Sequence, residues 1–510
     1  MANVILIFPR IKDVKSERPN LGVMYLAAML LKNNLSVQII DETVQDNAED
    51  LLDRYIASDT VCVGISALTG RQLCGALDVA NRVRIKHPGV PIVWGGTHAT
   101  GDPIGTLKHP LVDAICIGEG EVSFVEIVKA YLGGGDLSGI AGIGYKENGG
   151  KFFLTKPHES FFDLNNLPSL PYHLVDLDLY KMSGFPNFFG FKCSRVLSVE
   201  TSRGCPYRCT HCVQSVRKER FHGMNTENVV RFLEDIVKLD IRGVAIVDDN
   251  FFVDPARARQ VMGTVRQRGW NLEVFVAARS DYLAKADDNI YELIKDFGIK
   301  LFSIGVESGS DRVLREVINK KEHIADAYLA NEKLAKIGIH AFFHFIVGFP
   351  GETLSDIIQT YRAMTKILKN NRYAKVSNKK LIPLPGTVIL ERCVHGGMKR
   401  PETIEEWADI EDLLWNKKIT YVDPDAQQWF WSTRYYNNIM LILSYAHSLC
   451  NKMSIRLLRI LFTPAFFVTS WIIGMRSLLR ASCFSVDSIV MDLIALCVKN
   501  MLLVKNKIKK

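Results

Sequence analysis

Three cysteines lie close together in one short segment, Thr201-Ser-Arg-Gly-Cys205-Pro-Tyr-Arg-Cys209-Thr-His-Cys212, which follows the apolar run 196–199. Their spacing is C-x3-C-x2-C. Thiolates normally ligate every iron of a cubane 4Fe–4S cluster. A single loop with three cysteines leaves one iron open, and in a catalytic site that iron binds a substrate or a cofactor. We therefore expect Cys205, Cys209 and Cys212 to be metal ligands and part of a catalytic centre.

A structural zinc site is the alternative for the same cysteines. Such a site closes a tetrahedron of Cys and His ligands, and His211 or His222 would complete it. Zinc ribbons, however, usually pair one C-x2-C with a second, and the chain has no second pair. The iron–sulfur cluster is therefore favoured. The other cysteines are scattered in mostly apolar surroundings and are expected to be structural.

Length and composition indicate a large multidomain globular protein. The chain has 510 residues, of which 48% are hydrophobic, and domains usually take roughly 150 residues each. Its start reads as a strand rather than a basic leader, so we expect a reducing cytoplasm. The net charge of +8 is concentrated toward the C-terminus. Basic charge there is typical of a membrane surface or of nucleic acid, and no nucleic-acid module is visible.

Apolar runs alternate with amphipathic stretches over the first 145 residues. Strands are expected at 4–8, 37–40, 61–65, 92–94 and 114–117, with helices such as 21–31 and 72–85 between them. This alternation predicts a doubly wound parallel sheet, which binds ligands beyond the carboxyl ends of its strands. No G-x-G-x-x-G follows the first strand, which argues against a nicotinamide or flavin dinucleotide. The candidate binding residues in these loops are Ser66, Gly95, Gly96, His98 and Glu119.

Strand and helix alternate again after a proline-containing stretch. Six further strands are expected at 196–199, 244–247, 272–276, 301–304, 341–347 and 376–382. Barrels of parallel strands collect functional groups at the carboxyl ends of the strands. The candidates at these ends are Asp248, Asp249, Arg279, Glu307, Gly348 and Pro385. A single carboxylate is explained equally well as a helix cap or salt-bridge partner, but six strand ends in register favour a binding site.

The cysteine loop resembles that of the radical S-adenosylmethionine (SAM) superfamily, and the six units resemble its partial (β/α)6, TIM-like barrel. In that family the open iron chelates the amino and carboxylate groups of SAM, and one electron cleaves SAM to a deoxyadenosyl radical. The resemblance implies that Asp248 and Asp249 contact the SAM amino group and that Glu307 contacts its ribose or methionine end. Gly348 and Pro385 would lie on its adenine side. Arg279 is suited to hold a carboxylate with two hydrogen bonds.

The first domain resembles the cobalamin-binding domain of cobalamin-dependent radical SAM proteins. The similar segments are Pro19-Asn-Leu-Gly22, Ile65-Ser66-Ala-Leu-Thr69, Gly95-Gly96-Thr-His98 and Gly118-Glu119-Gly120-Glu121. The Asp-x-His-x-x-Gly motif that gives many cobalamin proteins a histidine ligand to cobalt is absent. His98 is an alternative ligand, although contact with the corrin edge or with backbone alone is favoured for it. Glu119 and Glu121 are equally explained as a charge pair at a helix N-terminus.

Together these inferences give an α/β chain of four parts. They are a Rossmann-like doubly wound cobalamin-binding domain (1–145), a linker (146–192), a radical SAM core barrel (193–390) and a helical C-terminal domain (391–510). The uncharged stretch 460–475 contains Pro464 and is shorter than the ~20 residues of a membrane span. Set among basic residues, it predicts an interfacial segment on an anionic membrane surface. A buried helix pair with a disordered basic end is an equal alternative.

By resemblance, the chain is an enzyme with a 4Fe–4S cluster, SAM and cobalamin as cofactors. The expected activity is methylation of an unactivated carbon in an apolar or complex metabolite, such as a lipid, hopanoid or porphyrin. We expect a flavodoxin or ferredoxin as electron donor and a cytoplasmic location, with peripheral contact to the inner face of the membrane as one alternative; a nucleic-acid partner is less supported. A non-methylating enzyme of the same build, like the anaerobic Mg-protoporphyrin monomethyl ester oxidative cyclase, is the alternative. A methylthiotransferase or a zinc-organised adaptor is more remote.

Overall fold

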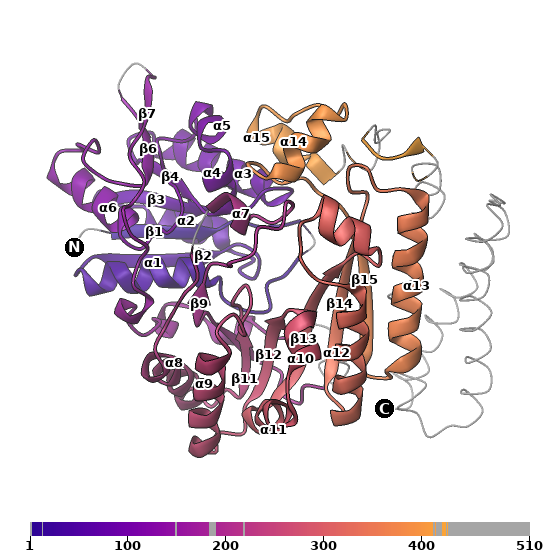
Figure 1. Cartoon of the computed structure of the whole chain (residues 1–510). Helices are drawn as coiled ribbons and strands as arrows, with labels where there is room; N and C mark the ends of the chain where they lie inside the picture. Colours follow the sequence, from indigo (N-terminus) through magenta and orange to yellow (C-terminus); the bar gives the residue numbers. More distant parts are fainter. Residues whose placement is uncertain are drawn as a thin grey trace, which may run out of the picture.

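The computed structural model describes residues 3–12, 14–147, 150–182, 190–217, 220–411, 414, 421–424 and 426. These residues form two main sheets, each accompanied by helices (Figure 1). The first sheet is drawn in indigo and purple, and the second in magenta to orange. The expected α/β architecture is therefore confirmed, with a doubly wound sheet followed by a parallel sheet of barrel type.

The first sheet has the strand order β2-β1-β3-β4-β5-β6-β7. Strands β1 to β5 run parallel, and β6 and β7 are antiparallel additions at one edge. Strand β1 is almost wholly buried because helices cover both faces of a sheet of this kind. Strand β7 lies within the range predicted as a linker, whose bounds stay a prediction. The strands are β1 (Asn3–Phe8), β2 (Ser36–Asp41), β3 (Thr60–Ser66), β4 (Ile92–Gly95), β5 (Ala114–Cys116), β6 (Ile143–Lys146) and β7 (Phe152–Leu154).

Strand order reverses between β1 and β3, which places a ligand crevice at their carboxyl ends. Helix α1 begins after Asn20, whose side chain accepts a 3.0 Å hydrogen bond from the Val23 amide and so caps the helix. The helices of this part are α1 (Leu21–Lys32), α2 (Ala48–Tyr55), α3 (Gln72–Lys86), α4 (Thr97–Gly101), α5 (Pro103–Lys108) and α6 (Ser123–Gly133).

The second sheet contains the six expected barrel strands in the order β15-β14-β13-β12-β11-β8, and all neighbouring strands are parallel. Along β14, Phe343 and Phe345 are fully buried whereas His344 is partly exposed. One face of the sheet thus packs on helices and the other lines the barrel interior. The strands are β8 (Val196–Val199), β11 (Gly243–Ile246), β12 (Glu273–Ala278), β13 (Ile299–Glu307), β14 (His340–Val347) and β15 (Ala374–Lys380).

Helices pack along the outside of the second sheet, as the right-hand part of Figure 1 shows for α12 and α13. They include amphipathic segments that bury one apolar stripe, as in α8, where Val229, Phe232, Leu233 and Ile236 are buried. The helices are α8 (Thr226–Lys238), α9 (Pro255–Arg268), α10 (Ser280–Lys285), α11 (Asp288–Phe297), α12 (Ile324–Ile337) and α13 (Leu354–Asn370).

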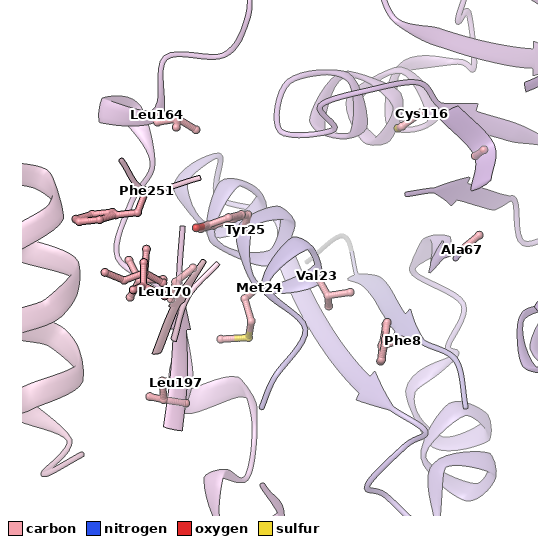
Figure 2. Packing of buried hydrophobic residues seen from close by; sticks show 14 of the residues in the cluster. Phe8, Val23, Met24, Tyr25, Ala67, Cys116, Leu164, Leu170, Leu197 and Phe251 are labelled. Carbon is pink, nitrogen blue, oxygen red and sulfur yellow. The ribbon is translucent and has the colours of Figure 1, made fainter. Parts of the chain in front are cut away.

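One apolar core extends through both parts of the described chain. Figure 2 shows Met24 and Tyr25 of α1 turned toward Leu170 and Leu197, with Phe251 nearby. Leu170 belongs to the segment between the two sheets, and Leu197 lies in β8. Helix α1 therefore contributes to the core of its own sheet and also contacts the start of the barrel.

The C-terminal part is described only at its beginning, with α14 (Val388–His395) and α15 (Ile404–Ala408). Helix α15 packs against α3 of the first sheet. Within the described residues, none of the helices combines the length and apolar character that crossing a membrane requires. The apolar stretch 460–475 and the basic end of the predicted helical domain lie outside the described residues.

Candidate active site

The cysteine loop leaves the second sheet at the end of β8 through the two-residue strand β9 (Ser202–Arg203). Gly204 follows with φ of 76°, and a Cβ at this position would lie 2.5 Å from the carbonyl oxygen of Arg220. Only glycine fits this left-handed turn beside another backbone. The three predicted ligands come next on the same loop, and all are partly exposed free thiols: Cys205, Cys209 and Cys212.

The middle of the loop is fixed to the far side of the barrel mouth. The Thr210 amide donates to the carbonyl of Ile318 at 2.8 Å, and its hydroxyl donates to the carbonyl of Val317 at 2.9 Å. Both acceptors lie at the end of a π-helical turn, Val313–Val317. Turns of this type are frequent at functional sites, and here the turn holds the loop that carries the cysteines.

Two cations counteract the effect of burial on two of the three cysteines. Burial raises the pKa of all three thiols, that of Cys212 to about 11. The charges of Lys320 and Arg279 lower the pKa of Cys205 and Cys209. Since the thiolate is the form that binds iron, these cations suit the loop to hold a cluster. Among the described residues, no group of three or more Cys, His, Asp or Glu side chains lies close enough together to hold a metal ion, so ligation of one cluster by all three cysteines stays a prediction.

Arg279, which follows β12, is already engaged by protein groups. Its guanidinium pairs with Glu322 at 3.0 Å and with Asp281 at 3.1 Å. The guanidinium carbon also lies 3.5 Å from the ring centroid of Tyr207, within the cysteine loop. Contact between Arg279 and a ligand carboxylate stays a prediction, because in the structure two protein carboxylates occupy its donors.

Glu307 ends β13 in an unusual backbone conformation. Its φ is 71°, and the pairing with β14 shifts register between Gly305 and Glu307. A non-glycine residue in this region is strained, and such strain is concentrated at functional sites. The Glu307 carboxylate passes over Gly305, where a Cβ would lie 2.3 Å from Oε1, and it faces the buried ammonium of Lys320 at 3.7 Å.

Asp248 and Asp249, after β11, occupy different environments. Asp248 is buried and accepts hydrogen bonds from the Thr201 amide at 2.6 Å, the Thr201 hydroxyl at 2.6 Å and the Ser202 hydroxyl at 2.5 Å. Asp249 is exposed and accepts from Gln214 at 2.8 Å. Asp248 therefore holds the start of the cysteine loop, whereas Asp249 remains accessible at the barrel mouth. Their predicted contact with SAM stays a prediction.

The loops after β14 and β15 close against different partners. Glu352 is fully buried and accepts from the amides of Gly348 at 2.6 Å and Phe349 at 3.1 Å, so its side chain closes the loop. Burial outweighs these two hydrogen bonds and raises the pKa of Glu352 to about 8. The Pro385 carbonyl packs on Gly101 of α4, where a Cβ would lie 2.8 Å away. The second loop therefore contacts the first sheet's helices.

A cavity of about 260 Å³ opens at the carboxyl ends of the first sheet's strands. Four of the five residues predicted in these loops line it: Ser66, Gly95, Gly96 and Glu119. Its opposite wall comes from the barrel part of the chain, through Glu200, Arg203 and Val247. The cavity therefore lies between the ligand-binding edge of the first sheet and the segment that begins the cysteine loop.

Much of the cavity wall is bare backbone. Six glycines line it, namely Gly22, Gly64, Gly95, Gly96, Gly118 and Gly120. Gly96 has a φ of 94°, and a Cβ there would lie 2.7 Å from the carbonyl oxygen of Ala67. A wall without side chains lets a large planar ligand approach the backbone closely. The first-sheet wall therefore fits the cobalamin that the resemblance implies.

His98 is not among the residues that line this cavity. Its ring is fully buried, shares a 3.1 Å hydrogen bond between Nδ1 and the Thr69 hydroxyl, and packs edge-on against Trp407 of α15. Burial lowers the pKa of His98 to about 4, so the ring is neutral at physiological pH. Its Nε2 has no hydrogen-bond partner in the described structure. Its predicted cofactor contact stays a prediction.

Arg203 joins the two walls of the cavity. Its three guanidinium nitrogens contact Glu119 at 2.8 Å, Glu121 at 2.6 Å and Glu200 at 2.6 Å. Although burial raises the pKa of Glu119, contacts with His222 and Arg203 outweigh it and lower the pKa to about 2. Burial raises the pKa of Glu200 to about 7 against the opposing effect of Arg203.

Two protein-family models match the chain in the regions just described. Residues 199–364 match the radical SAM superfamily, and residues 9–128 match the B12-binding domain. The first range contains the cysteine loop and the second contains the cavity's glycine loops. The chain carries a radical SAM domain and a B12-binding domain. It is an enzyme, and its cofactors are a 4Fe–4S cluster, SAM and cobalamin.

Curated proteins are similar to this chain over much of its length. An uncharacterized methyltransferase of Pyrococcus horikoshii is 29% identical over 426 residues, 82% of this chain and 88% of the relative. Cytidylyl-2-hydroxyethylphosphonate methyltransferase of Streptomyces wedmorensis is 24% identical over 78% of this chain and 83% of its own. The hopanoid C-3 methylase of Methylococcus capsulatus is 24% identical over 64% of this chain and 60% of its own.

Solved structures share the fold. The cobalamin-dependent SAM radical enzyme OxsB, with aqua-cobalamin and SAM bound, superposes with a TM-score of 0.66 at 17% identity, over 92% of this chain and 75% of its own. The radical SAM methyltransferase TsrM of Kitasatospora setae, with cobalamin and a 4Fe–4S cluster bound, has a TM-score of 0.63 at 20% identity, over 78% of this chain and 76% of its own.

Several residues of this radical SAM protein's site were missed by sequence reasoning. Arg203 lies two positions before Cys205, in the cysteine segment itself, and an arginine beside a metal loop was the available signal. Lys320 and Glu322 had no such signal, because they follow β13 at a distance and belong to no expected strand end. Their roles emerge only from their contacts with Arg279 and Glu307.

Proposed function

We propose that this radical SAM enzyme transfers a methyl group to an unactivated carbon of a small-molecule substrate. One observation carries the proposal, namely that a single cavity is walled by the glycine loops of the first sheet and by Glu200 and Arg203 of the barrel part. A substrate at this junction would lie between the predicted cobalamin site and the predicted SAM site. Radical methylation needs both cofactors, SAM and cobalamin, close to the same substrate carbon.

The residues of the chain would hold and orient the cofactors. Cys205, Cys209 and Cys212 would ligate the cluster, and the charges of Lys320 and Arg279 would favour the thiolate forms of Cys205 and Cys209. When bound, the cluster and SAM supply a radical that removes a hydrogen atom, and cobalamin supplies the methyl group.

The SAM contacts belong to the same proposal. Asp249 and Glu307 would bind the polar end and the ribose of SAM, and Gly348 and Pro385 would border its adenine. Asp248 would hold the start of the cysteine loop through its three hydrogen bonds, and its predicted contact with the SAM amino group belongs to the same proposal. The names of two relatives, both methyltransferases, support methyl transfer as the outcome.

The electron donor and the substrate class extend this proposal. A flavodoxin or ferredoxin is suited to supply single electrons to a cluster of low potential. An apolar substrate and peripheral membrane contact rest on the sequence of the C-terminal stretch, which lies outside the described residues.

Anaerobically purified protein with a reconstituted cluster tests the proposal. It would be incubated with reductant, cobalamin, SAM labelled in its methyl group and an extract of small molecules and lipids. We expect deoxyadenosine, demethylated SAM and transfer of label to an extract compound. Deoxyadenosine without transferred label would oppose methylation and favour a non-methylating radical enzyme. A single zinc in place of iron and sulfide would end the radical proposal.

A further inference from the structure

The segment 201–203 connects the two predicted cofactor sites and is held from both sides. On the barrel side, Asp248 accepts from the Thr201 amide and from two hydroxyls. Arg257 donates to the carbonyl of Thr201 at 2.5 Å and to that of Met224 at 2.9 Å. The start of the cysteine loop is thus fixed on the barrel.

On the other side, Arg203 reaches the first sheet. Its guanidinium contacts Glu119 and Glu121, which follow β5 and are more than 80 positions away in the sequence, with separations of 84 and 82 residues. The side chains of Arg203, Glu119 and Glu121 are only 9%, 12% and 6% exposed. These charges are therefore removed from water and depend on one another for stabilisation.

Both ends of this contact belong to a predicted cofactor site. Arg203 precedes Gly204 and Cys205, so its backbone position helps to set that of the first cluster ligand. Glu119 and Glu121 line the cavity together with the two glycines that alternate with them, Gly118 and Gly120. The buried guanidinium of Arg203 therefore belongs to the segment that begins the cysteine loop and contacts the Glu119–Glu121 loop of the predicted cobalamin site.

The balance of charges makes the position of the Glu119–Glu121 loop depend on Arg203. Three carboxylates meet this single guanidinium, and Glu119 has one further cationic candidate, His222, at 3.4 Å. Without Arg203, Glu119 and Glu121 would repel each other in a site of low dielectric. Because Gly118 and Gly120 precede these two glutamates, their loop has the backbone freedom to move apart. Loss of the arginine should therefore loosen the cavity wall.

We propose that Arg203 is a positioning residue that couples the two cofactor sites. Cobalamin bound against the first-sheet wall of the cavity would fix the Glu119–Glu121 loop, and the ion pairs with Arg203 would then restrict the start of the cysteine loop. By linkage, a cluster on the cysteines favours cobalamin binding to the same extent. The inference rests on the proposed function, because it requires both cofactors in the places assigned above.

The experiment measures how fast the cluster loses iron to a chelator. Protein with a reconstituted cluster is mixed anaerobically with bathophenanthroline, with and without saturating hydroxocobalamin, and the coloured iron complex is followed. In the native protein we expect cobalamin to slow iron loss about fivefold or more, the low end of typical coupling between sites. In Arg203→Gln and Glu121→Gln the ratio should fall close to one.

Three further variants separate coupling from general damage. Arg203→Lys keeps the charge and should retain part of the protection that Arg203→Gln loses. A purely structural defect would reduce the protection equally in both variants. The Arg203→Gln/Glu121→Gln double variant should lose no more protection than either single variant, because the two side chains act as one unit. Arg84→Gln removes a 2.6 Å ion pair with Asp113 at the opposite end of the first sheet and should keep full protection.

The possible results distinguish this inference from the proposed function. Cobalamin binding to each variant is measured separately by its visible absorbance. Equal protection by bound cobalamin in the native protein and in Arg203→Gln would overturn the coupling while leaving the proposed function intact. Absence of cobalamin binding to the native protein would overturn both. If Arg203→Gln does not fold, the near-isosteric Glu121→Gln variant decides the question in the same way.

Discussion

Glu307 combines a carboxylate beside Lys320 with a left-handed backbone, φ 71°. Left-handed geometry costs a residue with a Cβ roughly 1–2 kcal/mol, and glycine avoids most of this cost. Glu307→Gly and Glu307→Ala both remove the carboxylate, but only the glycine relieves the backbone. We therefore expect Glu307→Gly to be more stable than Glu307→Ala by about 1 kcal/mol, measured as a higher urea midpoint with an unchanged slope.

Equal midpoints for the two variants would contradict backbone strain at this strand end. The functional part of the assignment is checked with Glu307→Gln, which keeps the size of the side chain. If Glu307 binds SAM, this variant should bind SAM more weakly and form less deoxyadenosine. Undiminished SAM affinity would remove Glu307 from the proposed SAM site.

Cys209 is the middle ligand of the proposed cluster, and its loss cannot be replaced by a neighbour on the same loop. Cys209→Ala should abolish deoxyadenosine formation and leave the reconstituted protein without the broad visible absorbance of an iron–sulfur cluster. Cys193→Ala is the matched control, because Cys193 is a partly buried cysteine just before β8 and outside the loop. The control should retain iron, sulfide and turnover. A full cluster in Cys209→Ala would exclude this cysteine as a ligand.

At the scale of the elements, the loop after β14 contains a group whose protonation should affect stability. Burial raises the pKa of Glu352 to about 8 in the folded protein, whereas an unfolded glutamate titrates near 4.3. Its contribution to folding is therefore fully present below the unfolded pKa and is lost as pH rises through 8. Glu352→Gln stays neutral, so its melting temperature should fall less than that of the native protein between pH 6 and 9.

The exposed Glu292 of α11 provides the control for this pH dependence, since Glu292→Gln should leave the native slope unchanged. Parallel pH profiles for Glu352→Gln and the native protein would contradict a protonated Glu352. The measurement uses apparent melting temperatures under identical scan rates, because a chain of several parts need not unfold in one step.

Strands were predictable from the sequence because parallel strands buried on both faces are short, nearly continuous apolar runs. The run 196–199 is β8 (Val196–Val199), and the expected 244–247 is β11 (Gly243–Ile246), displaced by one residue. Strand ends then located Glu307 and Asp248. The Arg203 contacts were not predictable, because no periodicity links residues 84 positions apart. Nor does residue type reveal the left-handed backbone of Glu307.

At the scale of the whole molecule, the two sheets are joined by an apolar and a charged contact. Helix α1 packs Met24 and Tyr25 toward Leu170 and Leu197, as Figure 2 shows. Next to this packing, the guanidinium of Arg203 lies 5.4 Å from the ring centroid of Tyr25. The apolar contact stabilises the junction but permits small displacements of one sheet relative to the other. The ion pairs are directional and therefore hold specific side chains in place. Together they keep the cavity wall and the cysteine loop in one arrangement.

This arrangement divides the proposed radical formation and the proposed methyl transfer between two parts of the chain. All proposed cluster ligands and SAM contacts come from the barrel part, and the glycine loops come from the first sheet. Protein reconstituted with cluster but without cobalamin should therefore still form deoxyadenosine from SAM, while transfer of labelled methyl should be absent until cobalamin is added. Both products are quantified by chromatography. Methyl transfer without cobalamin would show that the first sheet has another role, and a strict cobalamin requirement for deoxyadenosine would place a SAM contact on the first sheet.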